Sequence, residues 1–209
     1  MKIGIIGAGS VGGTLGTAWA RKGHSVLFGV RDSSAPEWKE LLNRAGASAK
    51  AGTVADAGAC DVVVLATPWE ANQPAIQSAG DLTGKVLLDC TNPLLPDLSG
   101  LTLAHTTSGG EKVAAWAPGA RVVKIFNTTG FGNMANPLYG GEPAGMLYCG
   151  DDAAAKKVAA QLAVDLGFDP IDAGPLTQSR LLEPFALLWI TLAVKQGLGM
   201  DFAFRLMRR

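Results

Sequence analysis

The chain has 209 residues, of which 48% are hydrophobic, and 18 Lys and Arg residues balance 18 Asp and Glu residues. This length fits one domain with an appendage, or two small lobes, and the apolar content is ample for a core. The balanced charge provides no basic field for nucleic acid or an anionic membrane. An aromatic content of only 7% also disfavours a base-stacking platform.

The cysteines and the apolar segments predict a cytoplasmic protein. Cys60, Cys90 and Cys149 are far apart and form no CxxC or Cys/His spacing, so we expect reduced thiols and no metal site. The N-terminus is too quickly interrupted by glycine to be a signal peptide. The most apolar later stretch, residues 185–194, is half the length of a membrane span, so we expect no membrane insertion.

The chain alternates predicted strands and helices. Short apolar runs that stop at glycine or polar residues indicate buried strands, and longer periodic segments indicate helices. Ser108 and Glu111 form an S-x-x-E pattern that is typical of a helix start. The predicted elements in chain order are strand 2–7, helix 10–22, strand 25–30, helix 36–45, a weak strand 47–51, strand 61–67, helix 69–79, strand 85–91, helix 108–116, strand 121–127, strand 145–150, helix 152–166 and strand 169–174.

This alternation predicts an α/β fold with a doubly wound, mainly parallel sheet covered on both sides by right-handed crossovers. Residues 176–209 break the rhythm, because apolar residues recur there at three- and four-residue steps along one helix face. Pro184 lies within that pattern, so the helix should start near it or kink there. We therefore divide the chain into residues 1–175, the doubly wound domain, and residues 176–209, a small helical segment.

A glycine pattern follows the first predicted strand, in the sequence GIIGAGSVGG. Gly7, Gly9 and Gly12 have the G-x-G-x-x-G spacing, and a strand enters the pattern while a helix leaves it. Gly7 allows the tight turn, Gly9 lets a pyrophosphate approach the backbone, and Gly12 lets helix and strand pack closely. Ser10 and Val11 belong to the same turn, so their N–H groups are predicted to meet the phosphates as well.

The tip of the second strand, in VLFGVRDSS, bears on the choice of cofactor. Counting from Gly23 and His24 puts Val30 at the position where an NAD enzyme carries its ribose-binding carboxylate. Arg31 follows and is placed to pair with a 2′-phosphate, and the hydroxyls of Ser33 and Ser34 could add donors. Asp32 either caps the next helix or repels the phosphate. The stretch therefore favours NADP.

With these residues in view, the chain resembles the F420-dependent NADP reductase family, and also the related oxidoreductase domains of membrane ferric reductases. The resemblance covers nearly the whole chain and rests on GAGSVGGTLG, GHSVLFGVR, ATPWEA, DCTNPL, VVKIFNTTG, MLYCGDD and DAGPLTQSRLLEP in this order. It implies a Rossmann domain that binds NADP, with a small C-terminal lobe that completes a second pocket for coenzyme F420 or a flavin-like partner.

Polar residues stand at the ends of three predicted strands, where a doubly wound sheet binds its ligands. Small hydroxyl and amide groups there suit a nicotinamide carboxamide, and a proline and a tryptophan provide an apolar wall; turn formation and helix-start packing are the structural alternatives. The residues predicted to contact the cofactor in this region are Thr67, Pro68, Trp69, Asn92, Pro93 and Asn127.

Hydride transfer between stacked rings needs no side-chain acid or base, so no catalytic residue is predicted. The loop 128–137, with Phe131 and Met134, is predicted to help cover the second substrate, and Arg180 is predicted to pair with Glu183 on one helix face. Two alternatives remain: a reductase of small imines or a dehydrogenase of β-hydroxy acids, and a non-enzymatic dinucleotide sensor or redox partner domain. The C-terminal tail could dock a partner or form a homodimer seam.

Overall fold

A computed structural model of the protein describes residues 1–36 and 38–209, and its centre is an eight-stranded sheet in the order β10-β9-β6-β5-β4-β1-β2-β3. Each strand is short and most are buried along their length, as in a sheet covered on both faces. The strands are β1 (Lys2–Ile6), β2 (Ser25–Gly29), β3 (Ala49–Gly52), β4 (Val62–Leu65), β5 (Val86–Asp89), β6 (Arg121–Lys124), β9 (Gly145–Gly150) and β10 (Asp169–Asp172).

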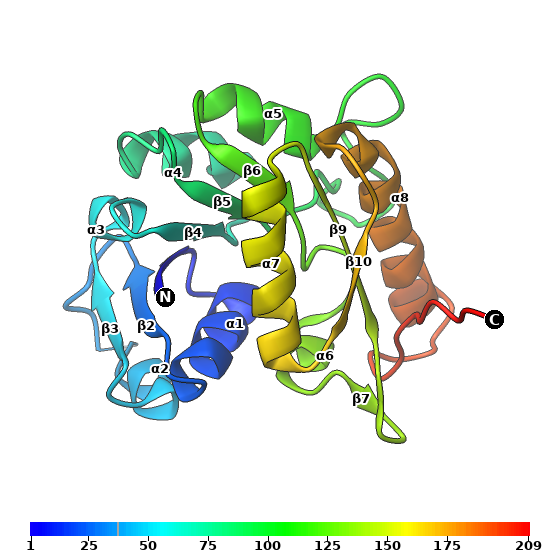
Figure 1. The fold of residues 1–209 in the computed structure, drawn as a ribbon, viewed down its shortest axis with the longest axis horizontal. Coiled ribbons are helices and arrows are strands. Elements are labelled where there is room, and N and C mark those ends of the chain that lie inside the picture. The colour runs from blue at the N-terminus through cyan, green and yellow to red at the C-terminus, as the bar shows by residue number, and fades with distance from the viewer. Residues whose placement is uncertain (37) are drawn as a thin grey trace.

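The sheet reverses its direction of growth between β1 and β4. From β1 the chain builds outward through β2 and β3, and it then returns to place β4, β5 and β6 on the other side of β1, all in parallel register. Figure 1 shows this arrangement, with β2 and β3 at one edge and β9 and β10 toward the other. The β1/β4 junction is therefore the switch point at which such sheets bind ligands. The predicted doubly wound, mainly parallel α/β fold is confirmed.

One face of the sheet is covered by four helices. Alternate strand residues such as Ile3, Ile5 and Val64 point to this side and join one apolar cluster. Trp19 anchors the layer, because its fully buried indole donates a hydrogen bond to the carbonyl of Leu162 at 3.0 Å and so ties two of the helices together. The four helices are α1 (Ser10–Arg21), α2 (Trp38–Ala45), α6 (Phe131–Ala135) and α7 (Ala153–Leu166).

The remaining helices cover the opposite face, around a second apolar cluster that contains Ile6, Val63 and Leu65. Ser108 caps the helix that begins at Gly109, since its side chain accepts a hydrogen bond from the N–H of Glu111 at 3.2 Å. The elements of this layer are α3 (Val54–Gly58), the 3₁₀ turn η1 (Trp69–Ala71), α4 (Asn72–Ser78), α5 (Gly109–Trp116), the 3₁₀ turn η2 (Leu176–Gln178) and α8 (Ser179–Ile190).

The strand β9 departs from the predicted alternation, because it runs antiparallel to β6. A parallel return needs a crossover, usually through a helix that covers the sheet. The connection from β6 to β9 contains only the five-residue helix α6 and a hairpin of two short strands, β7 (Leu138–Tyr139) and β8 (Glu142–Pro143). The loop predicted over 128–137 therefore contains a helix, and its Met134 is buried in the core.

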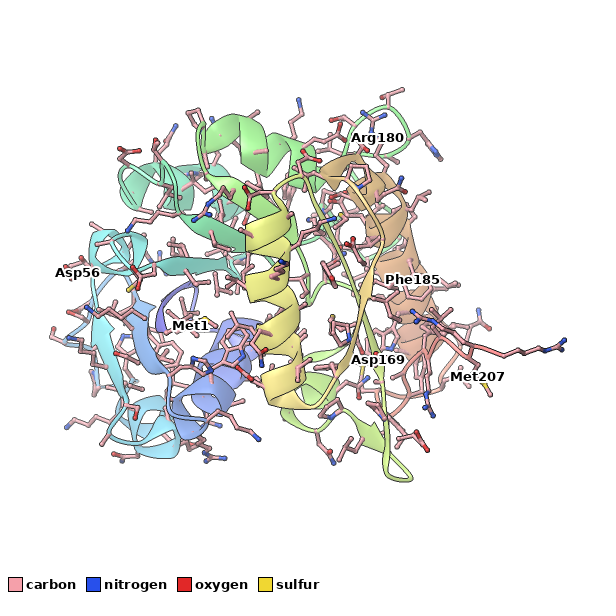
Figure 2. The ribbon with its side chains drawn as sticks, viewed as in Figure 1. Met1, Asp56, Asp169, Arg180, Phe185 and Met207 are labelled. Carbon is pink, nitrogen blue, oxygen red and sulfur yellow. The ribbon has the colours of Figure 1, made fainter. Side chains whose placement is uncertain are left out.

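The C-terminal segment begins with η2 and continues into α8, with Pro184 inside the helix rather than at its start. A π-helical stretch, η3 (Thr191–Lys195), follows, and the chain then extends without regular structure to Arg209. Figure 2 shows Arg180 and Phe185 on α8 and Met207 on the extended tail. Treating 176–209 as a separate segment remains a prediction. None of the helices in the described part of the chain is both long and apolar enough to cross a membrane.

Candidate functional site

The turn between β1 and α1 has a backbone that only glycine fits. Gly7 has φ of +99°, a region that L side chains rarely adopt, and a Cβ there would lie 2.6 Å from the carbonyl oxygen of Ala66. A Cβ on Gly12 would overlap the carbonyl oxygen of Gly7, so this glycine permits the close approach of helix and strand. Gly9 differs, because a Cβ there would meet no atom within 4 Å.

The open space beside Gly9 lies at the N-terminus of α1. Gly9 is the N-cap residue, and no side chain of the described residues bonds to the N–H groups of the first turn. These unpaired donors and the positive end of the helix dipole make an anion site. The backbone of Gly9, Ser10, Val11 and Gly12 therefore fits a phosphate group, as the glycine pattern predicts for a dinucleotide.

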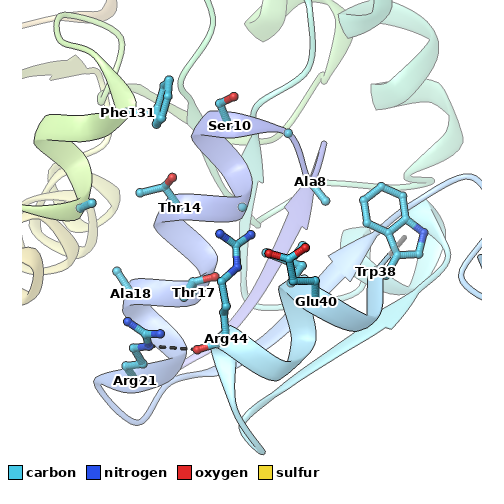
Figure 3. Close-up of a pocket in the computed structure, with 14 residues that line it drawn as sticks. Ala8, Ser10, Thr14, Thr17, Ala18, Arg21, Trp38, Glu40, Arg44 and Phe131 are labelled. Carbon is cyan, nitrogen blue, oxygen red and sulfur yellow. Dashed lines mark hydrogen bonds between the residues drawn. The ribbon is translucent and has the colours of Figure 1, made fainter. Parts of the chain in front are cut away.

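A groove of about 530 Å³ begins at this turn and follows the outer side of α1. Figure 3 shows Ser10, Thr14 and Thr17 of α1 on one side of the groove and Trp38 of α2 on the other. Arg44 also lines the groove, and its carbonyl accepts a hydrogen bond from Nε of Arg21 at 3.0 Å. Sequence reasoning missed most of this groove, because beyond the glycine turn its lining comes from helix faces that carry no recognisable motif.

The tip of β2 presents Arg31 to solvent. Val30 is buried, with its N–H donating to the carbonyl of Gly52 at 3.0 Å, whereas Arg31 is exposed. Asp32 turns toward Ser34, whose N–H and hydroxyl both donate to Oδ1 of Asp32, at 3.0 and 2.6 Å. These bonds lower the pKa of Asp32 and engage the Ser34 hydroxyl. Among the described residues, the carboxylate of Asp32 bonds only to Ser34, so it forms a local turn.

Arg31, Ser33 and Ser34 lie together on the exposed segment that follows β2. None of the three lines either of the cavities that adjoin the glycine turn. Their contact with a 2′-phosphate therefore stays a prediction. The structure leaves Arg31 without a hydrogen bond or ion pair among the described residues, so its guanidinium is available to an anion.

A second cavity, of about 290 Å³, lies at the carboxyl ends of β4 and β5. Its lining brings together five residues that the sequence predicted as cofactor contacts, together with leucines of the following loop. Val11 links this cavity to the glycine turn, because Gly9 and Ser10 line the outer groove while Val11 faces the cavity. The residues predicted from sequence in this lining are Val11, Thr67, Pro68, Trp69 and Asn92.

Two amides at the strand ends pair with each other. Nδ2 of Asn127 donates to Oδ1 of Asn92 at 3.0 Å, and Nδ2 of Asn92 donates to the carbonyl of Asn127 at 2.9 Å. Oδ1 of Asn127 is buried and has no hydrogen-bond partner among the described residues. An unpaired buried acceptor is costly, but Asn127 lines neither cavity, so its contact with a carboxamide stays a prediction.

Beneath this edge lies a buried ion cluster that the sequence analysis did not identify. Nζ of Lys124 lies 2.6 Å from Oδ2 of Asp89 and 2.9 Å from Oε1 of Glu183, and the three side chains are at most 1% exposed. Burial alone would lower the pKa of Lys124, but the two carboxylates outweigh it and raise that pKa. The signal was present as single charged residues inside apolar runs, in VLLDC and VVKIF.

The predicted ion pair between Arg180 and Glu183 is wrong. Arg180 instead binds Glu111 of α5 through Nε at 2.8 Å and through Nη2 at 2.6 Å. This contact lowers the pKa of Glu111. Glu183 points inward to Lys124, so the two residues face different surroundings although they are neighbours on α8. Spacing along a helix could not reveal these partners from other elements.

Comparison with known proteins decides the family. The chain is 30% identical to the F420-dependent NADP reductase of Methanocaldococcus jannaschii, over 93% of each chain. It belongs to the F420-dependent NADP reductase family. The family model described as NADP oxidoreductase, coenzyme F420-dependent, matches residues 2–93. The resemblance inferred from the motifs is therefore confirmed, and the chain is a member of an NADP-dependent oxidoreductase family.

Two further relatives support this assignment. A crystal structure of a putative F420-dependent NADP reductase from Arthrobacter sp. FB24 superimposes with a TM-score of 0.89, at 34% identity over 100% of both chains. Metalloreductase STEAP3 of Rattus norvegicus is 29% identical over 89% of this chain, which spans only 36% of that relative. Solved imine reductases and reductive aminases share the fold at 17–20% identity, which is evidence for the fold alone.

We expect Gly9→Asp to weaken NADPH binding at least about tenfold, because it places a carboxylate where the phosphates meet α1. The fold should remain intact, since a side chain at Gly9 enters open space and Asp is a favourable N-cap residue. Gly9→Asn is the matched control, with the same size and no charge. Calorimetric titration of both variants checks this, and equal affinities for the two would contradict it.

We expect Arg31→Ala to weaken NADPH binding by about 1.5–3 kcal/mol, the range for a hydrogen bond to a charged group. NADH binding should barely change, because NADH lacks the 2′-phosphate. Dissociation constants for the two cofactors, measured on the same variant, separate these effects. An equal loss for both cofactors would show that Arg31 does not read the 2′-phosphate.

Proposed function

We propose that the protein transfers a hydride between NADP(H) and a deazaflavin or flavin-like ring, with coenzyme F420 as the first candidate. The observation that carries the proposal is the continuity between the uncapped N-terminus of α1 and the cavity at the ends of β4 and β5. A dinucleotide with its pyrophosphate at the N-terminus of α1 would place its nicotinamide in the cavity at the ends of β4 and β5. The contacts of the predicted cofactor residues are part of this proposal.

Bound NADPH supplies the hydride, and the protein supplies binding, orientation and exclusion of water. Pro68 and Trp69 form one wall of the cavity, and Trp69 is itself supported by Trp116, with ring centroids 5.3 Å apart. The amides of Asn92 and Asn127 provide hydrogen-bonding groups for a carboxamide. Such side chains hold two rings in one geometry without taking part in covalent chemistry.

The loop after β5 lines one part of the cavity. It folds back on itself through bonds from the N–H of Leu95 to the carbonyl of Gly100, at 2.9 Å, and from the N–H of Thr102 to the carbonyl of Pro93, at 2.7 Å. Three leucines of this loop, Leu94, Leu95 and Leu98, line the cavity. Their apolar side chains reduce the access of water, which protects a transferred hydride from competing reactions.

The identity of the second substrate rests on fewer observations than the use of NADP(H). The printed names of the relative from M. jannaschii and of the structure from Arthrobacter both contain F420, and this is the reason to place it first. A flavin is the second choice because its ring has a similar shape and reactivity. The shared fold of imine reductases gives the alternative of a small imine or β-hydroxy acid no further support.

We also propose that the protein is cytoplasmic and that it forms a homodimer. The three cysteines are free and two of them are buried, which agrees with a reducing, cytoplasmic environment. The apolar side chains of Leu181 and Leu188 are exposed on α8, which agrees with a homodimer seam in residues 176–209. Both remain predictions.

The proposal predicts that NADPH carrying deuterium at its transferable position will pass the label to F420 under anaerobic conditions. One of the two stereoisomers of the labelled cofactor should deliver deuterium to the ring carbon of the deazaflavin, because direct transfer uses one face of each ring. Mass spectrometry of the reduced F420 detects the label, and NADH is the control donor. FMN and FAD are offered in parallel as alternative acceptors.

With F420 as the acceptor, release of the deuterium to water would contradict direct transfer, even with NADPH oxidised, because a hydrogen on the deazaflavin ring carbon does not exchange with solvent. Oxidation of NADPH by FMN or FAD alone would move the assignment to a flavin. Binding of NADPH without oxidation by any of the three acceptors would favour the dinucleotide sensor.

A further inference from the structure

We propose that Lys124 is a positioning residue that fixes the nicotinamide end of the cofactor pocket by joining helix α8 to the turn that carries Thr91 and Asn92. This inference rests on the proposed NADP function and assigns a task to a cluster that lies outside the cavity lining. Lys124 touches neither cavity, so it acts through the residues it holds and not on the cofactor itself.

The ammonium group of Lys124 has three oxygen partners and no contact with solvent. Besides Asp89 and Glu183, at 2.6 and 2.9 Å, it donates to the backbone carbonyl of Thr91 at 2.8 Å. The three partners come from β5, from α8 and from the turn after β5. The carbonyl of Thr91 accepts a hydrogen bond and the two carboxylates form ion pairs, so oxygens from three separate elements surround the ammonium.

The turn at Thr91 is held at each of its polar groups. Its N–H and its hydroxyl donate to Oδ1 of Asp89, at 2.9 and 2.7 Å, while its carbonyl accepts from Lys124. The hydroxyl also accepts from Nδ2 of Asn72 at 2.7 Å, and Oδ1 of Asn72 accepts from Thr67 at 2.7 Å. Thr67, Thr91 and Asn92 all line the cavity. Through these hydrogen bonds, Lys124 helps to hold one wall of that cavity in place.

Glu183 connects the same ammonium to the C-terminal helix. Its two carboxylate oxygens accept the N–H groups of Gly109 and Gly110, at 2.8 and 2.9 Å, at the first turn of α5. A Cβ on Gly109 would lie 3.0 Å from Glu183, and one on Gly110 would lie 3.2 Å from the Lys124 side chain. The glycines therefore let the carboxylate approach, and the dipole of α5 offsets the second negative charge of the cluster.

Next to Glu183, the backbone of α8 reaches the amide pair. The carbonyl of Leu182 accepts a longer hydrogen bond, at 3.4 Å, from Nδ2 of Asn127, which also bonds Asn92. Asn92 is thus held by the turn after β5 and Asn127 by α8, and Lys124 joins this turn to this helix. A fully buried ion cluster contributes little net stability compared with apolar residues of the same volume. What it does provide is a unique arrangement of α8 against the strand ends.

The test compares two ligands on a variant with Lys124→Met. NADPH and 2′-phospho-ADP-ribose share the adenosine, the 2′-phosphate and the pyrophosphate, but only NADPH has the nicotinamide. Calorimetric titration should show NADPH binding weakened about tenfold and 2′-phospho-ADP-ribose binding changed less than about twofold. Because the substitution leaves two buried carboxylates and can impair folding, Glu183→Gln is the second variant, with the same expectation.

Arg180→Gln is the matched control, since it breaks the other contact between α8 and α5, the ion pair of Arg180 with Glu111, outside the buried cluster. It should leave both affinities unchanged. Equal weakening of both ligands in Lys124→Met or Glu183→Gln, or no change in either, would overturn the positioning role. A wild-type protein that binds both ligands equally would also overturn it, because the nicotinamide end would then make no contribution. If the wild-type protein binds neither, the proposed NADP function fails first.

Discussion

The structure depends above all on one buried ammonium and the two carboxylates around it. Lys124 stands at the end of β6, Asp89 at the end of β5, and Glu183 reaches them from α8. An unpaired charge in this position would cost several kcal/mol, so none of the three elements can shift without the others. This constraint explains why the C-terminal helix packs against the carboxyl ends of the strands, although the chain reaches α8 only after the sheet is complete.

In the proposed binding mode, one part of the dinucleotide contacts backbone groups at the carboxyl edge of the sheet, and another part contacts side chains there. On the α1 side the proposed contacts come from the backbone of the glycine turn, and the turn keeps its shape because Gly7 and Gly12 lack a Cβ that would meet neighbouring backbone. On the β4 and β5 side we propose that the contacts come from Thr67, Trp69 and Asn92, which line the cavity. The backbone site at α1 is common to many dinucleotide folds. The side chains at the ends of β4 and β5 are what distinguish one reaction from another.

The sequence was sufficient for features that depend on local chemistry. The βαβ unit, the glycine turn and the Ser108 cap follow from residues that are close in the chain, and the structure has each of them. Features that depend on residues far away along the chain could not be predicted from the sequence. The antiparallel strand β9 and the separation of Arg180 from Glu183 arise from tertiary packing. A lysine inside an apolar strand was visible, but its partners lie 35 and 59 positions away along the chain.

We propose that α1 and the cavity at the ends of β4 and β5 hold the two halves of one NADP molecule. A crystal structure of the protein with NADP⁺ tests this most directly. We expect the pyrophosphate on the N–H groups at the start of α1, the 2′-phosphate beside Arg31, and the nicotinamide in the cavity next to Trp69 and Asn92. A nicotinamide in the outer groove between α1 and α2 would contradict it.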